Sequence, residues 1–424
     1  MIDAILSVTF IVSIFTFCLW SALALLAERK EKPSPNLSVS VIIPAHDEEK
    51  CIESTVKSVI DSDYGYEVEA LVVDDGSCDR TYEIVSEMAR KDRRVKIIRT
   101  DHLGKALAVN EGVRNSSSEV VVLLDADSSL MPDALSKLVA PFEEGKVGAV
   151  SGIIGVFVNR NILTWFQEFE YVLSSMWRYI FDKIECTYVL PGFCALRRTY
   201  LEDVGLFETD TLSEDFDIGL KMHKAGYKVL MSKALMKTNV PQSLKGLMGQ
   251  RFRWGRGTVQ VLRKHKDMIL NPRYGFIGLY GLPNQIYFFV QSFFIVPITF
   301  YQIFGGYMRW YVANDQIITL GVLKYFFSSF SMYGTLEFTH KTLAGIWPMS
   351  WIFPLFLASY VLNMFYSFLA VVRVSKVNIR LPFVLFFLFP YYLLTLIFFI
   401  YPLLLEVNPA TRMSGHINVW EKNR

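Results

Sequence analysis

Four long apolar segments constrain the fold of this chain more than any other feature of its sequence. They lie at about residues 2–26, 276–304, 346–372 and 381–405. Each is at least as long as the roughly 20 residues that a helix needs to cross the apolar layer of a bilayer. The chain is 52% hydrophobic, with a mean hydropathy of +0.30, which is more apolar than an ordinary soluble protein. The sequence therefore predicts a membrane protein with one span before a polar region and three after it.

Basic residues next to these segments predict their orientation, because positive charges favour the cytoplasmic side. Three follow the first segment and three separate the last two: Arg29, Lys30, Lys32, Arg373, Lys376 and Arg380. We expect an uncleaved anchor at 1–30, a cytoplasmic region at 37–272, spans within 273–406, and a tail at 407–424 on the outer side. A weaker apolar segment at 317–332 leaves an interfacial, re-entrant or fifth spanning helix open. An integral protein of the plasma membrane is expected.

The region from 37 to about 240 alternates strand-like and helix-like patterns. This alternation predicts an α/β fold with a mostly parallel, Rossmann-like sheet. Predicted strands at 39–44, 71–74 and 120–124 each end close to carboxylates, among them Asp74, Asp125 and Asp127. Ligands bind at the carboxyl ends of such strands. Two aspartates separated by one residue suit a divalent metal that holds a diphosphate, although a solvated turn at the end of a strand remains the alternative.

Two further features of this region indicate phosphate or nucleotide binding. A turn containing Gly76 follows the second strand, and glycine lets the backbone approach a ligand closely. Lys105 begins the next predicted helix, where its ammonium group can reach a phosphate. The alternatives are an ordinary Asp-Gly turn and a solvated lysine.

Six motifs then occur in order along residues 37–257. They are SVIIPAHDEE at 40–49, VDDGS at 73–77, GKA at 104–106, DAD at 125–127, SED at 213–215 and QRFRW at 250–254. This set resembles the inverting family 2 glycosyltransferases with a GT-A fold. The last two motifs resemble those of the processive, membrane-embedded branch, which holds cellulose, chitin, hyaluronan and poly-N-acetylglucosamine synthases. Each motif alone is weak, but the ordered set is specific.

The resemblance implies a role for individual residues. Glu48 and Asp74 would contact uridine, Lys105 would lie near the diphosphate, and Asp215 would be the general base. Asp127 would bind Mn²⁺ or Mg²⁺, and Glu214 would belong to the catalytic motif. The full set of implied substrate-binding residues is Pro44, Glu48, Asp74, Asp75, Lys105, Asp125, Gly192, Phe193, Gln250, Arg253 and Trp254.

Several segments keep a second interpretation. The motif at 213–215 also resembles the acidic start of a helix. The segment at 191–198 fits either an acceptor-lining stretch or a buried strand with a basic end. An amphipathic helix over 162–180 fits the membrane interface or packing onto the core. The basic segment at 244–266, within a predicted interfacial region at 241–272, fits a diphosphate site or lipid headgroups.

The predicted function is processive, inverting transfer from a UDP-sugar, with UDP-N-acetylglucosamine as the favoured donor. The expected partners are the donor, a growing polysaccharide and the lipid bilayer; nucleic acid is not expected, and accessory subunits are left open. Alternatives are a hyaluronan or cellulose type of synthase with another UDP-sugar, a single transfer to a membrane lipid, and a transporter with a nucleotide-sensing domain.

Overall fold

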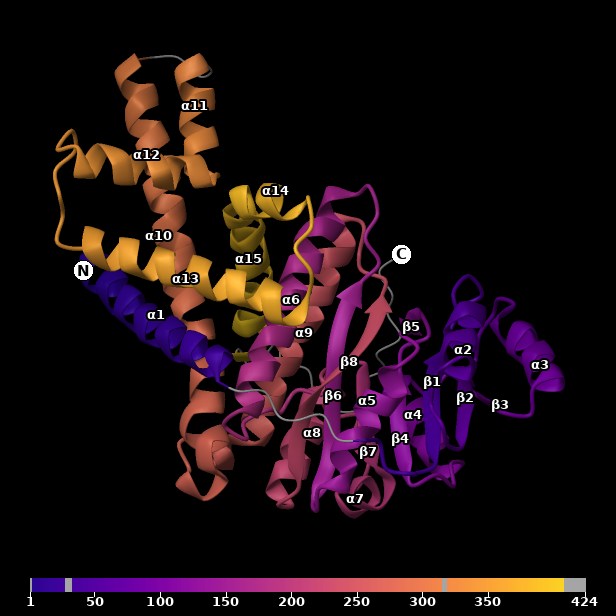
Figure 1. Cartoon of the computed structure of the whole chain (residues 1–424). Coiled ribbons are helices and arrows are strands. Elements are labelled where there is room, and N and C mark those ends of the chain that lie inside the picture. The colour runs from indigo at the N-terminus through magenta and orange to yellow at the C-terminus, as the bar shows by residue number, and fades with distance from the viewer. Residues whose placement is uncertain (1, 27–32, 315–318, 408–424) are drawn as a thin grey trace. The chain divides into compact units, whose positions relative to one another are not determined.

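The structure is a computed structural model that describes residues 2–26, 33–314 and 319–407, and the chain divides into two compact units. The helical unit contains Met1–Leu26 and Asn284–Leu404. The sheet unit contains Ala27–Pro283 together with the C-terminal segment from Leu405. The elements of both units are labelled in Figure 1.

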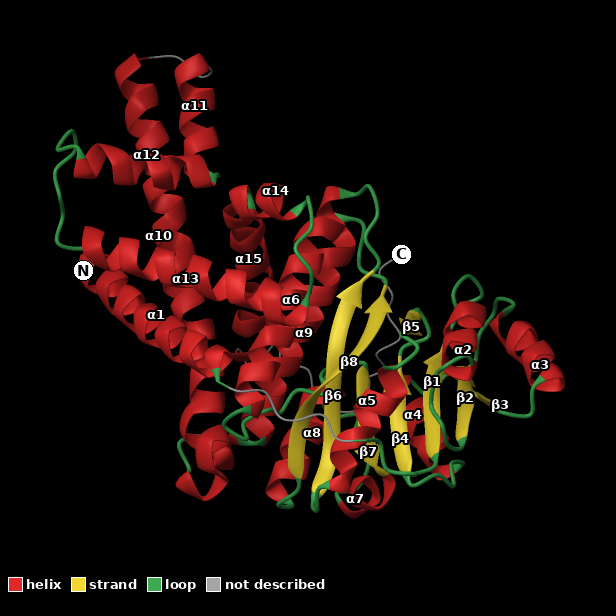
Figure 2. Cartoon of the chain, viewed as in Figure 1, coloured by secondary structure: helices red, strands yellow, loops and turns green. Residues whose placement is uncertain are grey.

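The sheet unit is built on eight strands in the order β3-β2-β1-β4-β7-β6-β8-β5. Their bounds are β1 Val39–Ala45, β2 Val68–Asp75, β3 Val95–Thr100, β4 Val120–Leu124, β5 Ser128–Leu130, β6 Val147–Val156, β7 Phe193–Arg197 and β8 Lys228–Thr238. Strands β1 to β4 are parallel, whereas β7 is antiparallel to both of its neighbours and β5 is antiparallel to β8. The sheet, yellow in Figure 2, is therefore mixed, with a parallel half on the side of β1 to β4.

Helices cover both faces of this sheet, because alternate residues of each strand point to opposite faces. The helices of the unit are α2 Ile52–Ile60, α3 Thr81–Lys91, α4 Lys105–Arg114, α5 Ala134–Val139, α6 Ile162–Asp182, α7 Arg198–Asp203, α8 Glu214–Lys224 and α9 Leu244–Lys264. Val41 and Ile43 of β1 face a core that includes α2, α3 and α5. Ile42 faces a second core that includes α4, α7 and α8.

Most of the predicted elements of this unit are confirmed. Strands β1, β2 and β4 cover the expected segments, and α4 begins at Lys105 as predicted. Bends and turns follow β1, and α2 begins at Ile52. Within the segment at 191–198, Phe193–Arg197 form the largely buried strand β7. Helix α6 packs against β6 and β8, which supports the packing interpretation of its apolar face.

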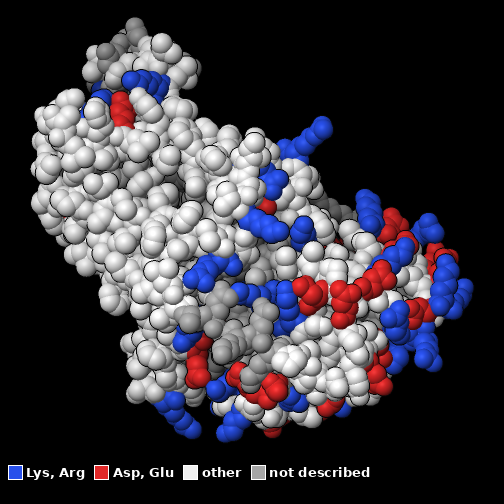
Figure 3. All heavy atoms as spheres, viewed as in Figure 1, with Lys and Arg blue, Asp and Glu red and all other residues white. Residues whose placement is uncertain are grey.

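Among the residues that the structure describes, four helices are long and apolar enough to cross a membrane, as predicted. They are Ile2–Leu25, Ile277–Ala313 (which begins in the sheet unit), Phe353–Val374 and Leu388–Glu406 (which ends in it). The labelled helices are α1 Ile2–Leu25, α10 Leu282–Asn314, α11 Leu320–Ser329, α12 Met332–Leu343, α13 Phe353–Val374, α14 Leu381–Phe386 and α15 Leu388–Val407. Charged side chains gather over the sheet unit, while the surface of the helical unit is almost free of them in Figure 3.

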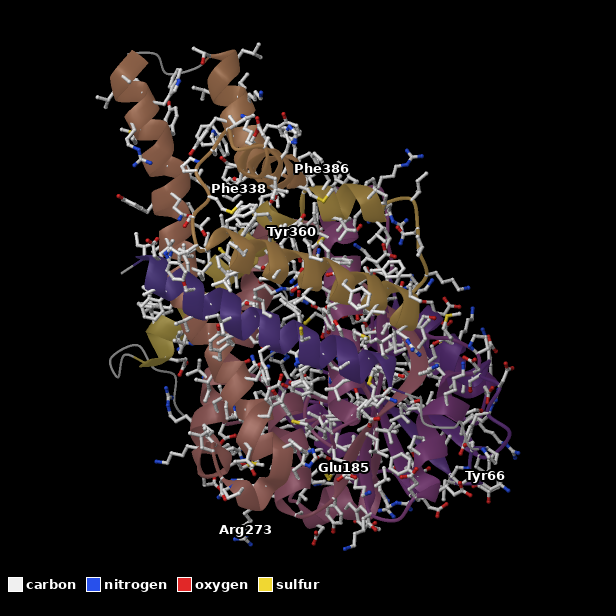
Figure 4. All side chains as sticks on the ribbon, turned by 60° about the vertical axis from the view of Figure 1, so that its left-hand side comes forward. Tyr66, Glu185, Arg273, Phe338, Tyr360 and Phe386 are labelled. Carbon is white, nitrogen blue, oxygen red and sulfur yellow. The ribbon has the colours of Figure 1, made fainter. Side chains whose placement is uncertain are left out.

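Aromatic side chains make many of the contacts between these helices. The ring centres of Phe338 in α12 and Phe356 in α13 are 5.7 Å apart. Those of Phe327 in α11 and Phe386 in α14 are 5.9 Å apart. Phe338, Tyr360 and Phe386 are labelled in Figure 4. Without a strong hydrophobic force between helices in lipid, such van der Waals packing is what holds them together.

Two expectations for this unit need correction or refinement. The run at 381–405 is not one helix, because α14 ends at Phe386 and α15 begins at Leu388. Pro390 explains the break, because it has no N–H to bond the carbonyl of residue 386 and its ring clashes with that carbonyl in a continuous helix. The doubtful segment at 317–332 holds the short helix α11 and the start of α12, with residues 317 and 318 outside the described part. The predicted tail after residue 407 also lies outside it.

Candidate functional site

Three carboxylate-bearing segments meet at one edge of the sheet. Strand β1 lies between β2 and β4 and is parallel to both, with Ala45 opposite Asp74 and Ile42 opposite Leu123. The strands therefore end side by side, at Ala45, Asp75 and Leu124. The predicted convergence of these strand ends is confirmed.

Lys105 lies between two carboxylates from different parts of the chain. It begins α4 after Gly104, whose φ of 95° is open to glycine but strained for other residues. Its Nζ lies 2.7 Å from Oδ1 of Asp125 and 3.8 Å from Oε1 of Glu214. Burial alone would lower the pKa of Lys105, but Asp125 and Glu214 outweigh it and raise the pKa above its ordinary value. The ammonium group thus stays charged and links β4 to α8.

Asp75 shapes the loop that leads to Lys105. Its Oδ1 accepts hydrogen bonds from the backbone N–H of Leu103 at 2.7 Å and from the hydroxyl of Thr100 at 2.6 Å, and its Oδ2 accepts one from the N–H of Gly104 at 2.8 Å. Three donors already occupy this fully buried carboxylate. The structure thus gives it a positioning role beside the substrate-binding role predicted for it.

Asp74 is the buried carboxylate with spare hydrogen-bonding capacity. It is 0% exposed, and neither carboxylate oxygen has a hydrogen bond of good geometry among the described residues, although the hydroxyl and N–H of Ser77 are near enough to lower its pKa. Its one ion pair is to Nε of Arg99, at 3.5 Å. Burial raises the pKa of Asp74. A buried acceptor without a donor is costly, so a ligand N–H at this point would be stabilising.

The other two predicted residues at this edge are largely enclosed by protein. The backbone N–H of Glu48 donates to the hydroxyl of Thr81 at 2.7 Å, and the residue is 8% exposed. Pro44 is buried within β1, opposite Val73 of β2. Pro44 is next to Ala45, which lies opposite Asp74, and the roles predicted for Pro44 and Glu48 stay predictions.

The turn at 125–127 presents two carboxylates side by side. The hydroxyl of Thr55 donates to the carbonyl of Ala126 at 2.8 Å, and the N–H of Ser128 donates to the carbonyl of Asp125 at 3.0 Å. Asp127 accepts a hydrogen bond from the hydroxyl of Thr238 at 3.2 Å. Burial and the charge of Asp125 raise the pKa of Asp127 to about 6.

These features fit a divalent cation. Carboxylate oxygens are hard donors that Mg²⁺ and Mn²⁺ prefer. The raised pKa of Asp127 reflects a carboxylate whose negative charge is poorly compensated by the protein. A cation at Asp127 would offset that charge.

Gly192 approaches Asp125 so closely that no side chain fits. A Cβ atom at Gly192 would lie 2.7 Å from Cγ of Asp125 and nearer still to its Oδ2. Phe193, the next residue, is fully buried in β7, and its ring fills the space beside Gly152. Strand alternation directs the side chain of Phe193 into the core, and substrate binding at this residue stays a prediction.

Glu214 and Asp215 begin α8, as the motif at 213–215 predicts. Ser213 occupies the N-cap position but makes no capping hydrogen bond with its side chain. Oδ1 of Asp215 accepts a hydrogen bond from the N–H of Phe216 at 2.9 Å. Burial and the charge of Glu214 raise the pKa of Asp215 to about 6, against the opposing charges of Lys105 and Arg253. Asp215 is therefore a carboxylate with the basicity of a useful proton acceptor near neutral pH.

Helix α9 carries the motif at 250–254, and its two arginines have different roles. Arg251 is fully buried and donates hydrogen bonds to Oε1 of Gln250 and to Oε2 of Glu170, both at 2.5 Å. Its guanidinium also lies 4.3 Å from the centre of the Trp254 ring. Arg253 makes no hydrogen bond or ion pair with the described residues, yet its charge acts on Lys105 and Asp215. Arg253 is thus the cation of this motif that is available to an anionic ligand.

Two residues of α6 near the site were not predicted. Tyr171 is close enough to Asp127 and Asp125 for their charges to affect it, and burial raises its pKa to about 12. Arg178 is buried, donates to the hydroxyls of Ser151 and Ser175, and is near Asp215. The sequence pattern grouped Arg178 with the polar residues of this amphipathic helix, so its burial was not predictable from the spacing.

Comparisons with known proteins agree with this geometry. Residues 40–205 match the model of a family described as glycosyl transferase family 2. A poly-β-1,6-N-acetyl-D-glucosamine synthase from Staphylococcus epidermidis is 30% identical over 341 residues, which cover 74% of this chain and 78% of that protein. A synthase of the same description from Staphylococcus aureus strain COL is 28% identical over 246 residues, covering 55% and 58%.

The fold has a counterpart among solved structures. A mannosyltransferase from Pyrobaculum calidifontis, solved in complex with GDP-Man and Mn²⁺, superposes with a TM-score of 0.58. It is 21% identical, and the match covers 88% of this chain and 98% of that one. At this level of identity the likeness establishes the fold, which is the predicted GT-A core with additional helices.

Proposed function

The chain belongs to glycosyl transferase family 2, and on this premise we propose that it is a processive, inverting synthase that polymerises UDP-N-acetylglucosamine and moves the product across the membrane. The observation that carries the proposal is Lys105, bonded to Asp125 and lying beside Glu214, with Asp215 next in the chain. This arrangement brings together a cation for a diphosphate and a raised-pKa carboxylate for an acceptor hydroxyl. The relatives that match over most of the chain support the sugar.

The proposed chemistry is a single displacement. The acceptor hydroxyl forms a bond to C1 of the sugar while the bond from C1 to the diphosphate oxygen breaks. Asp215 takes the hydroxyl proton, and UDP leaves. Because charge develops on the departing diphosphate, Lys105 and Arg253 stabilise the transition state more than the ground state. Asp127 would hold a divalent metal, Mn²⁺ or Mg²⁺, whose charge also offsets that of the diphosphate.

Donor recognition is proposed at the strand ends. Asp74 would accept a hydrogen bond from an N–H of the base, which satisfies the buried oxygens that lack a donor. Trp254, stacked on Arg251, would offer an aromatic face to a sugar ring of the acceptor. Gly192, where a side chain would collide with the carboxylate of Asp125, would let a ring approach the backbone.

The proposal is tested with purified full-length protein in detergent micelles and Mn²⁺ or Mg²⁺. UDP-N-acetylglucosamine, UDP-glucose and UDP-glucuronate are supplied separately, UDP release is measured, and the products are sized. Long polymer from UDP-N-acetylglucosamine at low donor conversion is the expected result. Polymer from another donor would change the sugar, and a single sugar on a lipid would replace processive synthesis with one transfer.

Movement across the membrane needs a sealed compartment. Protein reconstituted into liposomes, with the sheet unit outside, should accumulate polymer that an added glycosidase digests only after detergent is added. Polymer that is digested without detergent would separate synthesis from movement across the membrane.

A further inference from the structure

Glu406, the last residue of the fourth candidate span, is a buried carboxylate within the sheet unit. Its side chain is 0% exposed. Oε1 accepts from Nε of Arg256 at 2.7 Å and from Nε2 of Gln260 at 3.1 Å, and Oε2 lies 3.4 Å from Nη1 of Arg263. Nη2 of Arg263 also donates to the backbone carbonyl of Glu406 at 2.5 Å. The proposed chemistry does not use this cluster.

The three partners of Glu406 lie on one face of α9. Residues 256, 260 and 263 are four and then three positions apart, which places them in line along a helix. A buried carboxylate is tolerated when cations and hydrogen-bond donors compensate it, and removal of one partner is costly. Glu406 is therefore a fixed attachment point between the end of α15 and α9.

Gln260 makes a second contact, on the side of the active site. Its Oε1 accepts a hydrogen bond from the backbone N–H of Leu212 at 2.9 Å. The amide must then point its Nε2 toward Glu406, because a backbone N–H needs an acceptor and a carboxylate needs a donor. A single buried amide thus joins Glu406 to the segment that precedes the proposed base.

Helix α9 holds this segment on both sides of Asp215. A Cβ atom at Gly257 would lie 2.9 Å from Cβ of Ser213, so the helix backbone touches the residue that precedes the acidic pair. Further along, Nζ of Lys264 lies 3.0 Å from one carboxylate oxygen of Asp217, and Nε2 of His265 lies 2.6 Å from the other. The position of α9 therefore sets the position of the start of α8.

We propose that Glu406 and Gln260 are positioning residues for the transferase reaction: they fix α9, and through the Leu212 N–H they hold Asp215 at the acceptor hydroxyl. The inference rests on the proposed function. It assigns the end of the last apolar helix a part in the reaction, although Glu406 contacts no substrate.

The test compares Gln260→Leu, Glu406→Gln and Gln260→Glu with the parent protein. Each removes part of the series of contacts from Glu406 through Gln260 to the Leu212 N–H, which we call the relay. The kcat should therefore fall roughly 10- to 100-fold, as expected when a catalytic group is misplaced by a fraction of an ångström to 1 Å. The Kd for UDP with Mn²⁺ should stay within about twofold, because the strand ends are untouched. Glu337→Gln is the matched control, since Glu337 also pairs with two lysines but lies in the helical unit.

An exchange of the two side chains gives the decisive rescue. In the double variant Gln260→Glu with Glu406→Gln, one carboxylate and one amide remain beside Arg256 and Arg263. The new carboxylate can still accept from Leu212 and from the new amide. The kcat of the double variant should return to within a few-fold of the parent value. A double variant as slow as Gln260→Glu alone would overturn the relay.

A readout that does not need sugar transfer separates this inference from the proposed function. Amide hydrogen exchange of the peptide containing Leu212 should be faster in Gln260→Leu and Glu406→Gln and unchanged in Glu337→Gln. If the parent protein transfers no sugar, the proposed function fails, but amide hydrogen exchange at Leu212 still tests whether Glu406 and Gln260 hold this segment. Unchanged exchange, unchanged kcat, or a loss of UDP affinity equal to the loss of kcat would each overturn the inference. If Glu406→Gln does not fold, the Gln260 variants decide.

Discussion

Gly192 and Asp125 are in direct contact, with no room for a methyl group between the glycine backbone and the carboxylate. The carboxylate of Asp125 is in turn bonded to Lys105 at 2.7 Å. A side chain at residue 192 would therefore displace Asp125 or break its bond to Lys105.

Gly192→Ala should lower turnover at least about tenfold, because the carboxylate must move from its aligned position. Steady-state UDP release measures this effect. Gly145→Ala is the control, since nothing lies within 4 Å of a Cβ atom there. Equal activity of the two variants would show that the contact at Gly192 is not needed.

Asp215→Asn should reduce kcat by at least ~10²-fold, as the loss of a general base does. Calorimetric titration with UDP and Mn²⁺ should give nearly the parent affinity, because Asp215 is assigned to the acceptor and not to the nucleotide. Retained turnover would remove Asp215 from the mechanism.

The pH profile should show an acidic limb. Burial and Glu214 raise the pKa of Asp215 to about 6, so the base is increasingly protonated below that pH, and kcat at pH 5 should be about one tenth of its plateau. The limb of kcat/KM, which reports the free enzyme, should be steeper, because the pKa of Asp127 is also raised to about 6.

Glu214→Gln separates the two contributions to this limb. The substitution removes a like charge next to Asp215, so it should lower the pKa of Asp215 and move part of the limb to lower pH. A limb that stays in place or moves to higher pH would assign the titration to another group.

Asp127→Asn should abolish the dependence of UDP affinity on Mn²⁺. The parent protein should bind UDP more tightly with Mn²⁺ than with a chelator, and the variant should bind equally weakly in both. If the parent affinity is the same with and without Mn²⁺, the metal assignment at Asp127 fails.

Glu170→Gln should destabilise the protein by about 3 kcal/mol, because it leaves the fully buried Arg251 without its carboxylate. The apparent melting temperature in detergent should drop by several degrees. Lys57→Gln, which breaks an exposed pair with Glu53, is the control and should leave the melting temperature almost unchanged. A similar shift in both variants would show that burial of Arg251 is not decisive.

The sequence was sufficient for the half of the site that lies on parallel strands. A buried apolar run that ends in Asp125 leaves little choice of structure, and parallel strands place their carboxyl ends at one edge. Lys105 was predictable for a similar reason, because glycine before a first-turn residue marks the start of a helix next to that edge. These features are local and depend on few other contacts.

The remaining features depend on tertiary contacts that no local pattern encodes. Phe193 follows Gly192 in a segment that suggested a ligand site, but the register of β7 turns its ring into the core. Asp75 has the same chemistry as Asp74, and only the loop at 100–104 shows that its oxygens are occupied. Arg251 and Arg253 are separated by a single residue, and the packing of α9 against Glu170 decides which one is buried.

The bonds between Glu406 and α9 also lead to an expectation for how often the chain crosses the bilayer. The chain leaves the sheet unit after Pro283 and rejoins it at Leu405, so we expect an even number of complete passages between these two points. Three complete passages by α10, α13 and α15 would end on the opposite face, as the predicted outer tail requires. Either one of these helices turns back within the bilayer, or α11 and α12, where Glu337 is bonded to Lys341, supply a fourth passage. A protease site placed after residue 407 should then be cut from the same side as one placed at Gly145.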